Sequence, residues 1–396
     1  MMVGLLGSMV LLVDIGIPDA WGALTFAGRV TGFLFVLLGV VDGMAALAVL
    51  DYWGRRKLKH SGAVILLAVL IALASDSLLL ILWLQEREHT PYLLMYFPLW
   101  CWSLWALRIL FREKAWREIP HPKKFAAGVT ATALLATVNI AYSAIYQPTA
   151  APVLFSVKIT FGKPRIDPER SIIFLPVTLQ EKNTGTVPSY ILADDYTVYG
   201  RSDKYANRDK GLRDTRNAME NEDDDARLYA GVPTRETVSA GTLYQPGAWL
   251  EPGELYTEDR VIEFPKSAKY DAVEADLYVT IMRKDRGKID EEFAIPRYSW
   301  HKDEGRFYCP PDKCGEYVIH HGVIRHNNNL INVTRRPRYV NSIWEVNSQN
   351  SQSGVYISSD PGGGDDSKGE EGRYGIEEAE AHVTIPFAAL LSPPGV

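Results

Sequence analysis

The first 147 residues contain apolar stretches too long for an ordinary soluble core. A helix needs about 20 mostly apolar residues to cross a bilayer. Four stretches reach that length: 30–50, 62–84, 91–111 and 125–146. A fifth, 1–17, is short and carries Asp14, so it could span, act as a signal-like segment or lie in the interface. The sequence therefore predicts a membrane α-helical bundle of four or five transmembrane helices over residues 1–147.

The charge changes sign after this apolar region. Residues 1–147 carry 12 Lys and Arg against 9 Asp and Glu, whereas residues 148–396 carry 30 against 39. An acidic, evenly polar second part is typical of a water-soluble domain. It also argues against a nucleic-acid partner, which would favour a basic face.

Two loops hold most of the basic residues of the apolar region. They are 55–59 and 112–124, whereas the alternate loops carry Arg29 and Arg87 alone. Because cytoplasmic loops of membrane proteins are enriched in Lys and Arg, these two loops should face the cytoplasm. The stretch 125–146 then runs outward. We expect a multi-pass protein of the cell membrane whose residues 148–396 lie outside the cytoplasm.

Three polar residues interrupt the apolar stretches. Asp42, Asp76 and Asn139 each lie about 12 to 14 residues from one end of their stretch, near the bilayer middle at the helical rise. A charged Asp at that depth costs about 2.5–3.5 kcal/mol, so such groups usually face the bundle interior and pair. We predict one intramembrane polar layer, with Ser75 and Ser77 within reach. It could serve as a proton or ion relay, or as interhelical glue in which a protonated carboxyl donates a hydrogen bond.

From residue 150 the apolar pattern changes to a period of two. In "PVLFSVKITFGK", Phe155, Val157, Ile159 and Phe161 alternate with polar residues, as in a half-buried strand. Similar stretches recur at short spacing, separated by turn residues such as "NTG". This rhythm predicts an antiparallel sandwich. Over residues 153–285 it resembles the immunoglobulin-like modules of bacterial surface proteins, which implies an extracytoplasmic all-β, immunoglobulin-like domain within 148–396.

Two stretches break the strand rhythm. Residues 200–247 form a charged insertion, in which "RDTRNAMENEDDDARLYA" could form a helix and the rest a long loop. Residues 358–375 are rich in Gly and acidic residues and predict a flexible loop.

Few residues suggest chemistry in the second part. Cys309 and Cys314 close a small loop, which outside the cytoplasm predicts a structural disulfide. The His320, His321 and His326 group could bind zinc or copper, but alternation on a strand separates the first two, so we expect solvated histidines of a strand or hairpin. A Ca²⁺ site is conceivable in the Gly-rich loop, although its spacing is not that of an EF-hand. Its candidate ligands are Asp360, Asp365, Asp366 and Glu370.

No catalytic or cofactor motif was found: no phosphate loop, no His-Glu-x-x-His and no Gly-x-Ser-x-Gly. The leading hypothesis is therefore a membrane protein that presents its outer domain for binding or scaffolding, with the lipid bilayer and an envelope protein or polymer as partners. The second is a transporter or channel component that uses the polar layer. An envelope enzyme has no positive support.

Overall fold

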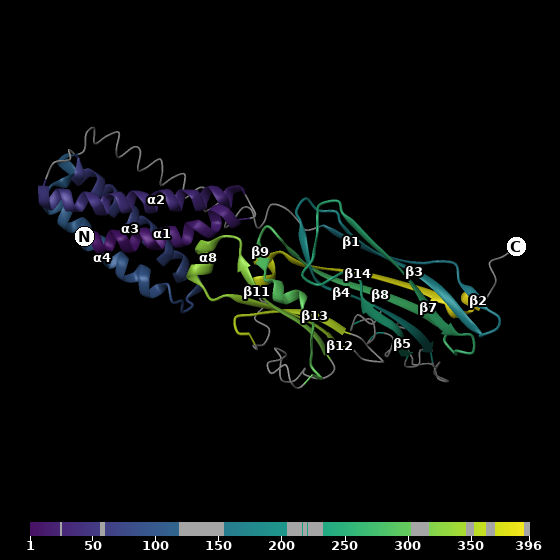
Figure 1. Cartoon of the computed structure of the whole chain (residues 1–396). Helices are drawn as coiled ribbons and strands as arrows, with labels where there is room; N and C mark the ends of the chain where they lie inside the picture. The colour runs from purple at the N-terminus through teal and green to yellow at the C-terminus, as the bar shows by residue number, and fades with distance from the viewer. Residues whose placement is uncertain are drawn as a thin grey trace. The chain divides into compact units, whose positions relative to one another are not determined.

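The computed structural model describes residues 1–23, 26–55, 60–118, 154–203, 216, 220, 233–301, 317–345, 352–361 and 369–391 (Figure 1). Contacts divide the chain into two units. A helical unit comprises Met1–Pro152, Asp285–Lys288 and Ile324–Arg338, and a β-rich unit comprises Val153–Lys284, Ile289–Val323 and Tyr339–Val396. The helical unit thus includes two short segments from the second part of the sequence. We call 285–288 and 324–338 the cap segments.

Four long helices build the helical unit, α1 (Met2–Gly22), α2 (Phe26–Leu50), α3 (Ser61–Glu86) and α4 (Leu93–Arg112). Each is long and apolar enough to cross a membrane, by length and composition. A π-helix η1 (Asp51–Arg55) follows α2, and a 3-10 helix η2 (Ala115–Glu118) follows α4. The ambiguous stretch 1–17 is therefore part of a full-length apolar helix. The predicted helix 125–146 lies outside the described residues.

Helices α1 and α2 approach each other closely through glycine. A Cβ atom added to Gly32 on α2 would lie 2.2 Å from the backbone nitrogen of Ala20 on α1. Gly16 on α1 faces the same contact, where an added Cβ would lie 2.7 Å from the Gly32 carbonyl oxygen. Small residues at such crossings let two helix backbones touch, which is a common way of packing apolar helices.

The described residues of the second part form three antiparallel sheets. The first has β3 (Ile172–Asn183) between β7 (Leu255–Pro265) and the pair β1 (Phe155–Phe161) and β2 (Arg165–Asp167). The second has the order β14 (Ile376–Pro386), β8 (Ala272–Arg283), β4 (Ser189–Asp203), β5 (Pro233–Thr242), with β6 (Trp249–Leu250) also on β4. The third has the order β10 (Arg297–Tyr298), β11 (Tyr317–His326), β12 (Arg338–Glu345), β13 (Gln352–Ser358), with β9 (Gly287–Ile289) on β11.

The first two sheets share one apolar core. It contains alternate residues of β3 (Ile173 to Leu179) and of β8 (Val273 to Ile281), closed by Phe387 and Leu390 of α10 (Phe387–Leu391). The predicted alternation of β1 is confirmed, because Ile159 is buried while Lys158 and Thr160 are exposed. The short helices α8 (Asn329–Thr334), α9 (Glu370–Tyr374) and η4 (Glu291–Ala294) complete the elements used below.

The sheets extend beyond 153–285, because β14 pairs with β8 along 11 residues. Two expectations about the second part need correction. Within 200–247, β4 continues to Asp203 and residues 233–242 form β5, so the expected loop is wrong there. Within 358–375, residues 370–374 form α9 and Tyr374 is fully buried, so this part of the predicted flexible loop is packed. Sequence pattern missed α9 because its apolar content is a single tyrosine.

Candidate functional site

Two of the three predicted polar-layer residues lie buried in the helical unit. Asp42 on α2 and Asp76 on α3 are both fully buried, and their carboxyl groups are close enough to interact electrostatically. The Ser8 hydroxyl of α1 donates a hydrogen bond to Asp42 Oδ2 at 2.6 Å. The other Asp42 oxygen and both Asp76 oxygens have no partner among the described residues. The structure thus places two of the three predicted polar-layer residues in the interior of the helical unit.

The remaining members of the predicted layer are placed differently. Ser75 donates to the backbone oxygens of Ile71 and Ala72 on its own helix. Ser77 likewise donates to the Leu73 oxygen, and accepts a hydrogen bond from Trp100 Nε1 at 3.0 Å. Asn139 lies outside the described residues. Ser8, which the sequence analysis did not select, is the serine that contacts the Asp42 carboxyl. Nothing in the sequence around Ser8 indicated that it would lie beside Asp42.

The cap segment 324–338 contacts the ends of α1 and α3. The backbone nitrogen of Asn329 donates to both carboxylate oxygens of Asp19 at 3.1 Å, and its side-chain amide donates to the Ile15 oxygen at 3.2 Å. The two segments also bind each other, because Asn327 donates to the backbone oxygens of Arg286 and Asp285. Figure 1 shows α8 against the bundle where α1 and α3 end.

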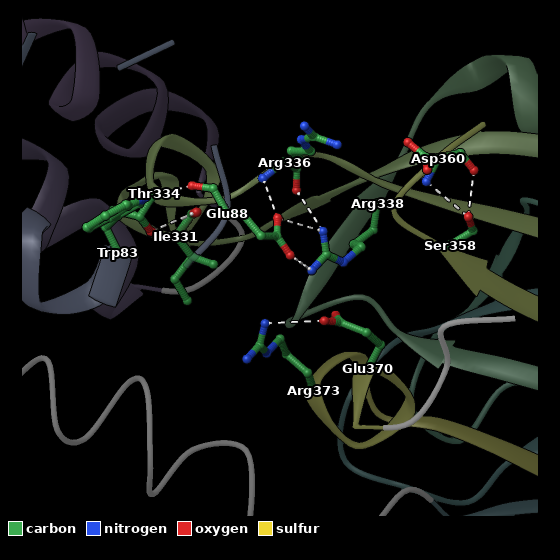
Figure 2. A network of polar contacts seen from close by, with 10 residues as sticks. All are labelled: Trp83, Glu88, Ile331, Thr334, Arg336, Arg338, Ser358, Asp360, Glu370 and Arg373. Carbon is green, nitrogen blue, oxygen red and sulfur yellow. Dashed lines mark hydrogen bonds and ion pairs between the residues drawn. The ribbon is translucent and has the colours of Figure 1, made fainter. Parts of the chain in front are cut away.

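An ion pair joins the same segment to the α3–α4 connection. Figure 2 shows the Glu88 carboxylate between Arg336 and Arg338. Arg338 donates through both terminal guanidinium nitrogens, one at 3.1 Å, and the Arg336 backbone nitrogen donates at 2.8 Å. Burial alone would raise the pKa of Glu88, but the hydrogen bonds and positive charge of the arginines outweigh burial and lower that pKa below 4.5. The connection is further held by Trp83, whose indole nitrogen donates to the Glu88 backbone oxygen at 2.6 Å.

Apolar contacts complete this docking. Leu330 and Val333 of α8 are buried in one cluster with residues of α1, α2, α3 and α4, among them Leu11, Leu79 and Tyr96. Sequence reasoning placed the "HNNNLINVT" stretch in the β-rich part and did not predict that it packs against the helices. Its only signal is the spacing of Leu330 and Val333, which share one face of a helical turn.

A second pair of buried carboxyls lies in the core of the β-rich unit. Glu181 continues the inward-facing set of β3 and is fully buried, and neither of its carboxylate oxygens has a hydrogen-bond partner among the described residues. Asp194 of β4 is equally enclosed; its Oδ2 accepts a hydrogen bond from the Tyr244 backbone nitrogen, while Oδ1 has no partner among those residues. We call Glu181 and Asp194 the core carboxyls.

A β-bulge directs Asp194 inward. The register of β4 against β8 shifts between Ile191 and Ala193. Ile191, Tyr196 and Val198 all belong to the core, although the first has an odd number and the others even ones. The extra residue reverses the alternation, so Asp194 falls on the core face and Asp195 on the other. Sequence alternation alone cannot locate such a shift.

Burial governs the protonation of these acids. It raises the pKa of Glu181 to about 8 and that of Asp195 to about 6, the latter opposed in part by a hydrogen bond from Ser353. Burial, and then the charge of Glu181, raise the pKa of Asp194 well above its usual value. Glu274, on the opposite face of β8, is paired with both Arg201 and Arg235. Burial therefore favours the protonated forms of the two core carboxyls.

The three histidines do not converge on one site. His320 Nδ1 lies 2.9 Å from the Phe293 oxygen, and His321 Nδ1 lies 2.6 Å from Asn341 Oδ1 while its ring stacks on Tyr339. Both are buried, so the expectation that they are solvated is wrong, and burial lowers the pKa of each. His326 Nδ1 accepts instead from the Asn328 backbone nitrogen at 3.0 Å.

The other predicted sites are only partly described. Asp360 lies beside Ser358, whose hydroxyl accepts from the Asp360 nitrogen at 3.0 Å, and Glu370 pairs with Arg373 at 3.4 Å (Figure 2). Asp365, Asp366, Cys309 and Cys314 lie outside the described residues. Within the described ranges, no group of three His, Cys, Asp or Glu residues is arranged to hold a metal ion.

Comparisons with known proteins give no functional assignment. No protein-family model matches the chain, and no curated protein does. Among solved structures, the protein described as ApaA from Bordetella pertussis is 14% identical, covers 34% of this chain and 83% of its own, and has a TM-score of 0.20. The sporulation control protein Spo0M from Bacillus subtilis is 9% identical, covers 58% of this chain and 90% of its own, and also has a TM-score of 0.20. Likeness at this level carries no argument about function.

Proposed function

We propose that this chain is a multi-pass protein of the cell membrane that presents an extracytoplasmic, immunoglobulin-like β-sandwich for binding or scaffolding at the cell envelope. Large apolar side chains exposed on the long helices support the lipid environment: Phe26 is 83% exposed, Leu94 74% and Leu47 69%. Water would penalise such a surface, whereas lipid solvates it. The partners are the bilayer and an envelope protein or polymer.

The position of the cap segments is the single observation that carries the orientation. Segment 324–338 contacts Asp19 near the end of α1 and Glu88 beyond the end of α3. This is the end of the helical unit opposite η1 and η2, which adjoin the Lys- and Arg-rich sequences 55–59 and 112–124. If those loops face the cytoplasm, the cap segments lie outside it.

The number of spans follows from the same relationship. The helices α1 to α4 alternate in direction if all four span, so η2 returns to the side on which α1 begins. The cap segments contact the other end. With this topology we assign one further crossing between residues 118 and 285 to the apolar stretch 125–146, whose length is sufficient. The proposal has five spans, with the fifth outside the described residues.

Connectivity supports an anchoring role. The chain passes from one unit to the other after residues 152, 284, 288, 323 and 338. A binding domain carried on a single flexible linker would cross once. Several covalent links are suited to holding the β-rich unit at the membrane, which is what a scaffold needs.

Reporter fusions after Lys59, Glu88, Lys124 and Gly200 test this topology. We expect a reporter that is active only outside the cytoplasm to be active after Glu88 and Gly200, and inactive after Lys59 and Lys124. Activity after Lys59 would overturn the orientation. Activity after Lys124 together with inactivity after Gly200 would do the same.

The buried carboxyls of the helical unit favour a second candidate, a transporter or channel component. Asp42 and Asp76 have three unpartnered oxygens among the described residues, and intramembrane carboxylates often mark ion paths. The test is proton flux through vesicles that contain the full chain and trap a pH-sensitive dye. Transport predicts that Asp76→Asn abolishes flux while the protein still assembles. Equal dye signals from vesicles with wild type, vesicles with Asp76→Asn and empty vesicles would contradict transport. The two carboxyls would then only hold the helices together.

A further inference from the structure

An apolar groove lies between the adjoining ends of α3 and α4. It encloses about 630 Å³ and is lined by residues of the last turns of α3, from Ser77 to Leu84, and the first turns of α4, from Leu93 to Trp100. That volume falls within the range of ligand pockets, about 300–1,000 Å³. Ser77 and Pro98 are the smallest side chains of the lining, and large ones such as Phe97 surround them.

The groove offers a ligand no unsatisfied hydrogen-bonding side chain. Ser77 is the only hydroxyl residue of the lining, and its oxygen already donates to the Leu73 oxygen and accepts from Trp100. The other indole nitrogen, that of Trp83, donates to the Glu88 oxygen. Since all three polar atoms are used internally, the groove presents hydrocarbon and aromatic faces, which suit an apolar chain.

The length of the groove along α3 fits within one leaflet of a membrane. Ser77 and Leu84 are seven residues apart, about 10 Å along a helix, whereas half the hydrocarbon core of a bilayer measures about 15 Å. Both helices also expose their apolar side chains beside it, with Ile81 56% and Leu94 74% exposed. An acyl chain lying along the helix axis would fill the groove and make van der Waals contacts with its apolar side chains.

A cation follows the groove at the end of α3. Arg87 is exposed and adopts the left-handed conformation, φ 56°, that ends the helix three residues beyond Leu84. A basic residue at this level can bind the phosphate of an anionic lipid headgroup. Arg29 provides a matched arginine at the same end of the bundle, where its Nε donates to the Ala23 oxygen at 2.9 Å.

We propose that the α3–α4 groove binds an acyl chain of an anionic phospholipid, with the headgroup phosphate at Arg87. The proposal rests on the membrane insertion of α3 and α4. The occupant is a lipid of the same leaflet and not a soluble apolar ligand, because the groove opens along two helices proposed to face lipid.

Native mass spectrometry of the full chain in detergent tests the groove with phosphatidylglycerol and phosphatidylcholine as probes. Wild type should retain phosphatidylglycerol. Ile81→Trp places a bulky ring in the groove and should lower retention of phosphatidylglycerol about tenfold. That factor corresponds to losing the burial of about one apolar side chain. Leu47→Trp, an equally large change on exposed α2 surface, should retain as much as wild type.

The arginine variants test the headgroup. Arg87→Gln should lower the preference for phosphatidylglycerol over phosphatidylcholine about fivefold, the effect of one basic residue beside anionic lipid. Arg29→Gln should leave the preference unchanged. Undiminished retention by Ile81→Trp, or an equal loss in Leu47→Trp, overturns the groove; an unchanged preference in Arg87→Gln overturns the headgroup contact.

Membrane pelleting separates this failure from failure of the proposed function. If the variants and wild type sediment with membranes in the absence of detergent but retain no phosphatidylglycerol, only the lipid site is wrong. If wild type remains in the supernatant, the membrane proposal and the groove proposal both fall.

Discussion

Arg338 and Glu88 are 250 residues apart in sequence, yet the guanidinium of one holds both carboxylate oxygens of the other. The Arg338 side chain is only 6% exposed, and Glu88 is its carboxylate partner at the α3–α4 connection. This pair is the point at which a segment from the second part of the chain is fixed to the helices. A buried ion pair of this kind stabilises a fold little more than apolar residues of similar size would. Removing one partner is nevertheless costly, because it leaves the other charge buried without its counter-ion.

Glu88→Ala should therefore destabilise the docking of the cap segments. It leaves the buried Arg338 guanidinium without its carboxylate, and we expect a loss of about 2 kcal/mol, below the value for a fully buried pair because Glu88 is partly exposed. Hydrogen exchange of amides 329–338 in the full chain measures the effect. Glu113→Ala, at an exposed position after α4, is the control. Equal exchange rates in wild type and Glu88→Ala would refute the role of the pair.

Acid should weaken the same contact. The pKa of Glu88 is lower in the folded chain than its usual 4.5, so the folded state binds the proton less readily than the unfolded state. The stabilisation is then present above pH 4.5 and is lost as the pH falls through the lowered pKa. The difference in exchange between wild type and Glu88→Gln should shrink as the pH falls below 4.5. A difference independent of pH down to full acid unfolding would contradict this.

Leu330→Ala should loosen α8. Leu330 is 1% exposed and packs among residues of α1, α3 and α4, so its truncation leaves a cavity that costs about 2–4 kcal/mol. Ile331→Ala in the same helix should cost less, because Ile331 is only half-buried. Protease cleavage within 324–338 of the full chain reports the opening. If both variants are cleaved at the wild-type rate, α8 does not depend on this contact.

The core carboxyls should make the β-rich unit sensitive to alkali. Because the folded pKa of Glu181 is about 8 against 4.5 for an ordinary glutamate, the folded state binds more protons between these values. Stability is therefore full below pH 4.5 and declines as the pH rises toward 8. The Gln side chain of Glu181→Gln needs no proton, so at pH 9 this variant should unfold at a higher temperature than wild type. We expect its free energy of unfolding at pH 9 to exceed that of wild type by at least about 1 kcal/mol.

Thermal unfolding of the full chain, followed by the β-sheet circular dichroism signal, measures this difference at pH 6 and pH 9. Glu263→Gln on the exposed face of β7 is the matched control and should show no gain. The idea fails if Glu181→Gln is less stable than wild type at both pH values, since the carboxyl would then contribute something that an amide cannot.

The local pattern of apolar and polar residues predicted the helices and strands that have a clear apolar side. The apolar stretches 30–50, 62–84 and 91–111 correspond to α2, α3 and α4, because a helix in lipid must be apolar on every side. Alternation located β1, because one of its faces lies toward the core while Lys158 and Thr160 are exposed. The depth of Asp42 and Asp76 in their stretches predicted that they would be buried. Their suggested grouping with Asn139 stays a prediction.

By itself the sequence determined which segments avoid water, since hydrophobicity and its period are properties of neighbouring residues. Only the tertiary structure decided that α8 belongs with the helices, that β14 closes the sheet of β8, and that Asp194 enters the core through the bulge in β4. These features depend on contacts between residues 94 or more positions apart, or on a one-residue shift in register. Their free energy comes from partners that no local stretch contains.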